Sequence, residues 1–217
     1  AKRLIGKTLM DVLDPEIVSS IRKIRNNRVR GSFGDILERH YFEIHPDNRS
    51  GLPDFDKAGV ELKSTPLLRR CSRLVAKERM VLSMIDYMGL PKESWERSSF
   101  LLKNKRLLTV FYMHEDGKAV IEYRIMVVGL WDFPPDDLEI IKSDWQKIQT
   151  MVREGRAHEI SEGDTIYLGA CTKGRNAKSN WRQQPFSIRK AKGLAFALKP
   201  SYVNSMIDRM IGRGDAE

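Results

Sequence analysis

The segment PDFDKAGVELKST, residues 53–65, constrains the fold of this chain more than any other stretch. Residues 56–59, with the sequence DKAG, are typical of a turn. After the turn, apolar and polar residues alternate as they do in a half-buried strand. Val60 and Leu62 are therefore expected to point into a core, and the residues between and after them to face the other way.

Three ionisable side chains are expected to meet on that other face. Glu61 and Lys63 share it, about 6–7 Å apart along the strand, and a bend at the turn would bring Asp54 beside Glu61. Two carboxylates, here Asp54 and Glu61, can hold Mg²⁺, which prefers oxygen ligands and keeps several waters. An ammonium group can orient an attacking water or stabilise charge on a phosphate. The set therefore predicts phosphodiester hydrolysis, although an ion pair on a surface hairpin would use the same residue types.

Charge and composition narrow the class of partner. The formal net charge is +9, which favours nucleic acid first and an anionic membrane surface second, against the alternative of a solvated lysine-rich surface. The sequence shows no signal peptide and no run of about 20 apolar residues, so a cytoplasmic protein without a membrane partner is expected. Zinc and cysteine-nucleophile chemistry fit poorly, because the four histidines have no ligand spacing and Cys71 and Cys171 stand apart from them.

The remaining pattern indicates a mixed α/β fold without a strict βαβ rhythm. Helices are predicted from Asp14-Pro15 onward, from Ser32 to Ile44, over Lys77–Met88, from Pro134 to Gly155 and over Ser201–Met210. Strands are predicted over Leu52–Phe55, Gly59–Thr65, Arg106–Met113, Lys118–Val128, Ile166–Ala170 and Leu194–Lys199. Residues 115–117, with the sequence EDG, are a hairpin signal between the third and fourth of these strands.

Several strings, in the right order, resemble one family of nucleases. The pattern P-D, a gap, then E-x-K is the signature of the PD-(D/E)xK superfamily, and GVELKSTPL at 59–67 closely resembles the active-site strand of MutH-type mismatch-repair endonucleases and their GATC-cutting type II restriction relatives. The string GDILERHYF at 34–42 resembles the family helix that carries a further active-site glutamate. Strings that resemble the restriction-enzyme branch are KERMVLSMIDY at 77–87, SSFLLKN at 98–104 and SEGDTIYLGACTKGRNAKS at 161–179.

The resemblance implies a restriction-endonuclease-like fold, with two lobes around a DNA-binding cleft, in a single catalytic domain over residues 1–217. It assigns catalysis to Asp54, Glu61 and Lys63, with Glu38 assisting. A second family lysine maps to either Lys103 or Lys105, and the sequence does not choose between them.

The resemblance also suggests which residues contact double-stranded DNA. Residues 172–176, Thr172-Lys173-Gly174-Arg175-Asn176, resemble the loop that enters the major groove, and Lys173 and Gly174 are expected to read bases. Phosphate contacts are expected from Arg30, Lys178, Arg182 and Lys199. Phe196 stands where the mismatch-repair enzymes carry a tyrosine that touches the adenine whose methylation they sense, which favours a restriction enzyme that tolerates methylation.

The function expected from these observations is a Mg²⁺-dependent type II restriction endonuclease that cuts at GATC in a prokaryotic cytoplasm. The first alternative is a MutH-like mismatch-repair nicking endonuclease. An alternative of another class is a non-catalytic DNA-binding regulatory domain, against which the complete Asp54, Glu61 and Lys63 set argues. Restriction enzymes of this type have a second, similarly folded half, so the chain is expected to be an excised domain that acts with that half or by dimerising on DNA.

Overall fold

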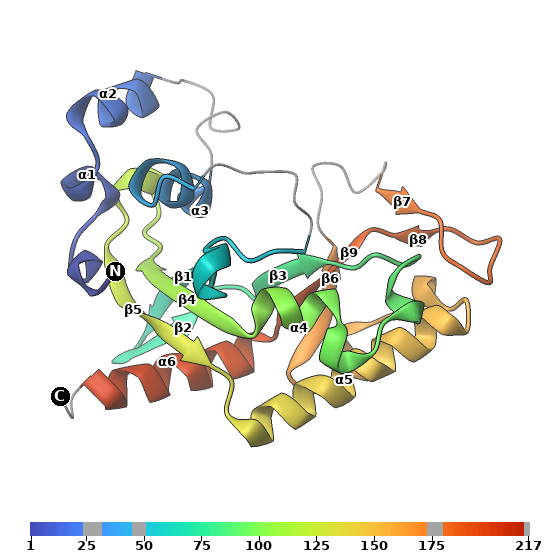
Figure 1. Ribbon diagram of the computed structural model, residues 1–217. Helices are drawn as coiled ribbons and strands as arrows, with labels where there is room; N and C mark the ends of the chain where they lie inside the picture. Colours follow the sequence, from blue (N-terminus) through green and yellow to red (C-terminus); the bar gives the residue numbers. More distant parts are fainter. Residues whose placement is uncertain (24–31, 45–50, 173–179, 215–217) are drawn as a thin grey trace.

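The computed structural model describes residues 1–23, 32–44, 51–172 and 180–214 (Figure 1). Its helices are α1 (Leu9–Val12), α2 (Pro15–Lys23), α3 (Phe33–Ile36), α4 (Ser99–Asn104), α5 (Pro135–Arg153) and α6 (Pro200–Gly214). Its strands are β1 (Glu61–Arg70), β2 (Arg73–Ala76), β3 (Met80–Met84), β4 (Arg106–Met113), β5 (Ile125–Asp132), β6 (Leu168–Thr172), β7 (Trp181–Arg182), β8 (Ala191–Lys192) and β9 (Leu194–Leu198). Within these ranges, no helix is both long and apolar enough to cross a membrane.

A mixed four-stranded sheet forms the centre of the fold, which confirms the predicted mixed α/β class. Its strand order is β2-β1-β4-β5, with β1 parallel to β4 and the other two pairs antiparallel. The parallel pair places Glu61 opposite Leu107 and Lys63 opposite Thr109. In Figure 1, α1, α2 and α3 lie to one side of this sheet, and α6 runs along its other side.

The two faces of the central sheet contribute to two separate hydrophobic clusters. On β4, Leu108 and Val110 pack with the N-terminal helices, whereas Leu107 and Phe111 pack with α5, α6 and the second sheet. This division follows from the alternation of side chains along a strand, since neighbours point to opposite faces. Leu62 joins the first cluster and is buried, as the sequence predicted.

A second sheet has the order β3-β9-β6, and a short ribbon, β7–β8, extends beyond it. Helix α5 holds this sheet through Asp144, a fully buried residue whose carboxylate accepts hydrogen bonds from the backbone N–H groups of Ile166, Tyr167 and Leu168 at 2.7–2.9 Å. The helix starts with Pro135 and ends before Gly155, whose φ of +70° suits glycine.

One predicted helix is wrong: residues 77–88 contain strand β3 instead. Met80 and Leu82 are buried, whereas Met84 and Met88 are exposed, so the methionines at helical spacing do not form an inward stripe. The long-range pairing of Met80 with Leu198 and Val81 with Ala197 determines this segment. A local periodicity cannot reveal such a pairing.

Three other predicted elements have different bounds in the structure. The strand expected over Lys118–Val128 starts at Ile125, after a 3-10 turn, although it pairs antiparallel with β4 as predicted. The strand expected over Leu52–Phe55 is reduced to one bridge between Phe55 and Val60. The helix expected from Ser32 is capped by that residue but continues past Ile36 as a π-helical turn, Leu37–Tyr41.

Candidate active site

A tight bend brings Asp54 next to the start of β1. Phe55 N donates to Val60 O at 2.9 Å and Val60 N donates to Phe55 O at 3.3 Å, which closes the bend between them. Gly59 ends the turn with a φ of +63°, in the left-handed region that favours glycine. The predicted neighbourhood of Asp54 and Glu61 is therefore confirmed, seven residues apart in sequence and in direct contact in space.

Hydrogen bonds fix the two carboxylates relative to each other. Asp54 N donates to Glu61 Oε2 at 3.1 Å, and Leu62 N donates to Asp54 Oδ2 at 2.9 Å. Lys63 lies on the same face of β1 as Glu61, and its Nζ is 2.5 Å from Glu61 Oε1. Glu61 is only 1% exposed. A buried carboxylate requires such partners, because burial without them is costly.

The structure brings Lys103, and not Lys105, to this cluster. Lys103 lies in the last turn of α4, and its Nζ is 3.5 Å from Glu61 Oε1. Lys105 is the exposed residue that ends the helix. Ser98 caps the start of this helix, because its hydroxyl accepts from Leu101 N at 3.2 Å.

Glu38 reaches the same place from the N-terminal helices. Burial, and next the negative charge of Asp54, raise the pKa of Glu38 to about 7. Its segment approaches β1 closely at Gly34, where an added Cβ would lie 2.9 Å from Ser64 Oγ. Burial also raises the pKa of Glu61, and the charge of Lys63 works against that rise. Burial disfavours the charged form of both carboxyl groups, and the negative charge of Asp54 adds to this effect.

The three carboxyl groups at this place outnumber the two lysines, which fits a divalent cation. Asp54 and Glu61 supply adjacent carboxylates, and in the described residues Asp54 uses only its Oδ2 atom as an acceptor. Across the same residues, no group of three or more histidine, cysteine, aspartate or glutamate side chains is arranged to hold a metal. Mg²⁺ does not need such a cage, because it is commonly held by one or two carboxylates together with waters and substrate phosphate.

The predicted DNA contacts have mixed outcomes. Arg30, Lys173, Gly174, Arg175 and Lys178 lie outside the described residues. Thr172, at the end of β6, and Arg182, in β7, are exposed.

Lys199 and Phe196 do not fit the contacts expected of them. The ammonium group of Lys199 donates to the carbonyl oxygens of Glu162 and Thr165, which gives it a structural role. Phe196 is 3% exposed and packs against Phe100 at a centroid distance of 5.1 Å. In this conformation its ring cannot touch a base, because the aromatic residues of β9 and α4 form a core rather than a surface.

Asp144 is a residue whose role the sequence did not reveal. It positions the start of β6, the strand that leads to the expected base-reading loop at residues 172–176. A signal was present, because Asp144 lies three residues after Ile141 and four before Ile148, on the buried side of α5. A carboxylate on a buried stripe indicates a backbone partner elsewhere in the fold.

Known proteins are similar to the chain over ranges that include the carboxylate and lysine cluster. Residues 42–144 match the family described as DNA mismatch repair enzyme MutH, a range that includes Asp54, Glu61, Lys63 and Lys103. The type II restriction enzyme Sau3AI of Staphylococcus aureus is 38% identical over 214 residues, which is 97% of this chain and 42% of that enzyme. The mismatch repair protein MutH of Shewanella baltica is 25% identical over 73% of this chain and 71% of its own length. MutH of Vibrio campbellii is 29% identical over 70% of this chain and 65% of its own length. These matches coincide with the hydrogen-bonded carboxylate and lysine cluster, and over residues 42–144 the chain is similar to the MutH family.

Proposed function

We propose that the chain is the catalytic part of a Mg²⁺-dependent type II restriction endonuclease that hydrolyses DNA at GATC. The observation that carries the proposal is the arrangement of Asp54, Glu61 and Lys63, joined by hydrogen bonds at the start of β1. The likeness to the restriction enzyme Sau3AI over 97% of the chain supports the choice of reaction and site. The chain spans less than half of that relative, so the activity of the whole protein is part of the proposal.

The chain's own residues have distinct parts in this reaction. Asp54 and Glu61 would hold the metal, which when bound activates a water and neutralises charge on the phosphate. Lys63 keeps Glu61 oriented and presents an ammonium group where charge builds on the scissile phosphate. Lys103 adds a second positive charge at the same carboxylate oxygen, Glu61 Oε1. Glu38, with a pKa of about 7, can accept a proton or a hydrogen bond from a water near neutral pH.

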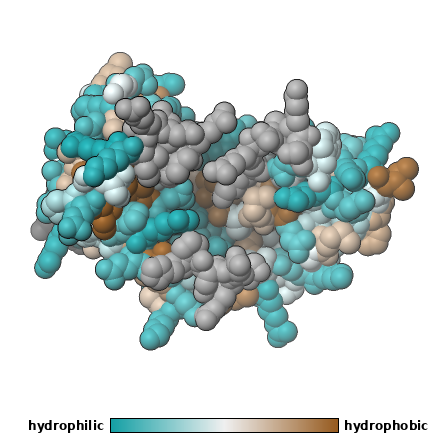
Figure 2. All heavy atoms as spheres, turned by 90° about the horizontal axis from the view of Figure 1, so that it is seen from above, coloured by the Kyte–Doolittle hydropathy of each residue, from teal (hydrophilic) through white to brown (hydrophobic). Residues whose placement is uncertain are grey.

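The substrate is proposed to lie in a cleft between two lobes. One lobe would be the N-terminal helices with their hydrophobic cluster, and the other the second sheet with α5. Outside the residues drawn in grey, the face seen from above in Figure 2 is mostly hydrophilic, which suits a surface that meets the phosphate backbone. Thr172 and Arg182 would contact the DNA from one side, beside the base-reading loop proposed at residues 172–176.

The proposal is tested by cleavage of a duplex with a single GATC, labelled on both strands, beside a matched duplex with GTAC. Cutting of the first duplex in Mg²⁺, and of neither in chelator, is the expected result. The variant Asp54→Asn should lose at least about 10²-fold in rate, since it weakens one of two metal-binding carboxylates. The control is Asp56→Asn in the same turn, because Asp56 is exposed and lies outside the cluster.

Equal rates for Asp54→Asn and the wild type would refute the assigned chemistry. Cutting of the GTAC duplex as fast as the GATC duplex would refute the assigned sequence while leaving the chemistry in place. Because the length of Sau3AI exceeds the matched part, we also propose that a second domain or a second copy completes double-strand cleavage. Nicked products from the chain alone, and double-strand breaks at high protein concentration, are the expected signs of the second copy.

A mismatch-repair nicking enzyme is the second candidate, favoured by the match of residues 42–144 to the MutH family. It would cut only the unmethylated strand of a hemimethylated GATC duplex. Equal cutting of unmethylated and fully methylated duplexes would exclude it. A non-catalytic regulatory domain would bind the GATC duplex tightly but leave it uncut in Mg²⁺.

A further inference from the structure

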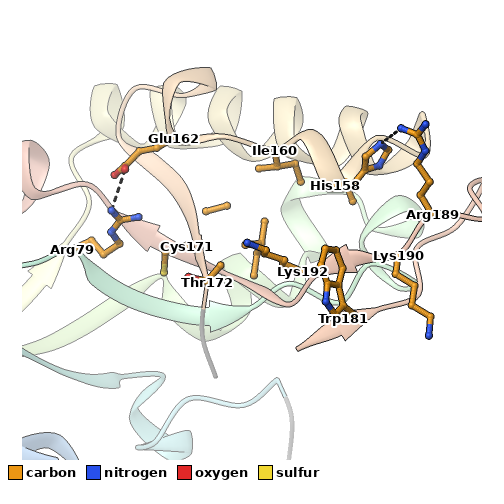
Figure 3. Close-up of a pocket in the computed structure, with 13 residues that line it drawn as sticks. Arg79, His158, Ile160, Glu162, Cys171, Thr172, Trp181, Arg189, Lys190 and Lys192 are labelled. Atoms are coloured by element: carbon orange, nitrogen blue, oxygen red, sulfur yellow. Dashed lines mark hydrogen bonds and ion pairs between the residues drawn. The ribbon is translucent and has the colours of Figure 1, made fainter. Parts of the chain in front are cut away.

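A pocket of about 730 Å³ lies on the second sheet, apart from the carboxylate and lysine cluster on the first (Figure 3). Its lining contains none of Asp54, Glu61 and Lys63. Apolar side chains, Ala170 and Leu194 among them, contribute to its surface. Pockets of this size, with an apolar surface and a few polar groups, are typical of small-ligand sites.

The polar side chains around this pocket are mainly basic. Arg79, Arg189 and Lys192 present their charged ends to it, and Glu162 is the one carboxylate among its lining residues. Glu162 is already engaged, because its Oε2 accepts from Arg79 at 3.0 Å. The ammonium group of Lys192 has no hydrogen bond or ion pair to other residues that the structure describes. The pocket therefore offers an anion at least one uncompensated cation.

An aromatic ring lies beside that cation. Trp181 is 48% exposed, whereas Trp95, Trp131 and Trp145 are 7% or less exposed. In the β7–β8 ribbon, Trp181 is the direct cross-strand partner of Lys192. Such partners have Cβ atoms about 4.5–5.5 Å apart and project to the same side. Figure 3 shows both at the pocket, with the end of the Lys190 side chain directed away from it.

The ribbon is held in place before any ligand arrives. Tyr87 donates from its hydroxyl to Lys192 O at 2.6 Å, and Gly193 N donates to Asn180 O at 2.7 Å. The loop between β7 and β8 is anchored by Gln184, whose Oε1 accepts from Ala157 N at 2.8 Å. A flat aromatic surface and an ammonium group, which are cross-strand partners on one ribbon, match a ligand that joins a planar ring to an anion.

We propose that this pocket binds a nucleotide, with its base against Trp181 and its phosphate on Lys192. Bases of any sequence stack on exposed aromatic side chains, and an ammonium group forms charge-assisted hydrogen bonds with phosphate oxygens. The nucleotide can be free, or it can belong to a strand of bound DNA. Thr172 lines the pocket and directly precedes the proposed base-reading loop, so the second source rests on the proposed function.

The test uses the whole chain in chelator, where cleavage is stopped. Deoxyadenosine monophosphate and the single-stranded tetranucleotide of deoxyadenosine are titrated while tryptophan fluorescence is followed. Saturable quenching is expected, because only Trp181 of the four tryptophans is substantially exposed. Lys192→Met should weaken binding about 10-fold or more. The matched variant Lys190→Met should change it less than about 2-fold, because that ammonium group points away.

Two results overturn the proposal: no saturable quenching by either probe, or equal weakening by the two lysine variants. Both variants are at exposed positions, and circular dichroism checks that they fold. A GATC duplex then identifies the source. Displacement of the mononucleotide by the duplex assigns the pocket to a nucleotide of DNA, and unchanged mononucleotide binding in its presence assigns it to a free nucleotide. If the wild type cleaves GATC but binds neither probe, the pocket proposal fails and the proposed function stands.

Discussion

Replacing Lys103 by methionine tests whether the approach of α4 to Glu61 matters for catalysis. The side chain of Lys103 is 25% exposed, with its Nζ 3.5 Å from Glu61 Oε1. Methionine keeps much of its length and apolar contact while removing the charge. Lys105→Met is the matched control, because Lys105 is exposed at the end of the same helix.

The expected size follows from the distance. Two unit charges 3.5 Å apart attract by about 4–5 kcal/mol at an effective dielectric constant of about 20. Glu61 shares its Oε1 with Lys63, and Lys103 is partly open to solvent, so about half of this energy is expected to act on the reaction. A loss of about 2 kcal/mol corresponds to about a 30-fold lower rate, because 1.36 kcal/mol is a factor of ten.

The assay is single-turnover cleavage of the GATC duplex in Mg²⁺ across a range of pH. Burial raises the pKa of Glu61, and Lys103 is one of the charges that work against that rise. Lys103→Met should therefore lower the rate and move the acid limb of the profile to higher pH. A rate within about 3-fold of wild type for Lys103→Met would refute this reasoning, as would an equal loss for Lys105→Met.

Three other variants test the energetics of the fold. Burial and the charge of Asp54 raise the pKa of Glu38 from 4.5 to about 7. Between these two pH values the metal-free native state therefore keeps a proton that the unfolded chain releases. The free energy of unfolding consequently falls as the pH rises from 4.5 to about 7. Glu38→Gln should therefore raise Tm in chelator at pH 8 and leave it nearly unchanged at pH 5; an unchanged Tm at pH 8 contradicts the raised pKa. Asp144→Ala leaves three backbone N–H groups without their acceptor, so urea titration should show a loss of about 3–5 kcal/mol, and a loss below about 1 kcal/mol would contradict that role. Gly155→Ala forces a left-handed φ, at a cost of about 1–2 kcal/mol, and puts a Cβ 2.5 Å from Phe186 O, so Tm should fall by several degrees; an unchanged Tm would mean that the loop moves freely.

The parts of the fold that the sequence predicted are those determined by neighbouring residues. The bend at residues 56–59 is specified by its own turn residues, which include Gly59. Helix α5 is specified by the spacing of its apolar residues and by the residues at its two ends. The prediction of a helix over residues 77–88 was wrong because two patterns are present there: methionines at helical spacing, and the alternation typical of a strand at Met80 and Leu82. The partner strand β9 decides between them, and it lies more than a hundred residues away.

The choice between Lys103 and Lys105 needed the same kind of distant information. Residues that are two positions apart in a helix lie about 200° apart around its axis, so only one of the two lysines can face a given strand. A six-residue helix has too few apolar residues in its sequence to show which one does. The parallel pairing of β1 with β4 brings this helix to the active-site cluster. Glu61 begins β1 and lies opposite Leu107, near the start of β4, so the end of α4 arrives at the same edge of the sheet. The bend and the start of β1 place Asp54, Glu61 and Lys63 together by local sequence alone. Lys103, which belongs to α4, reaches Glu61 only because β4 runs in the same direction as β1.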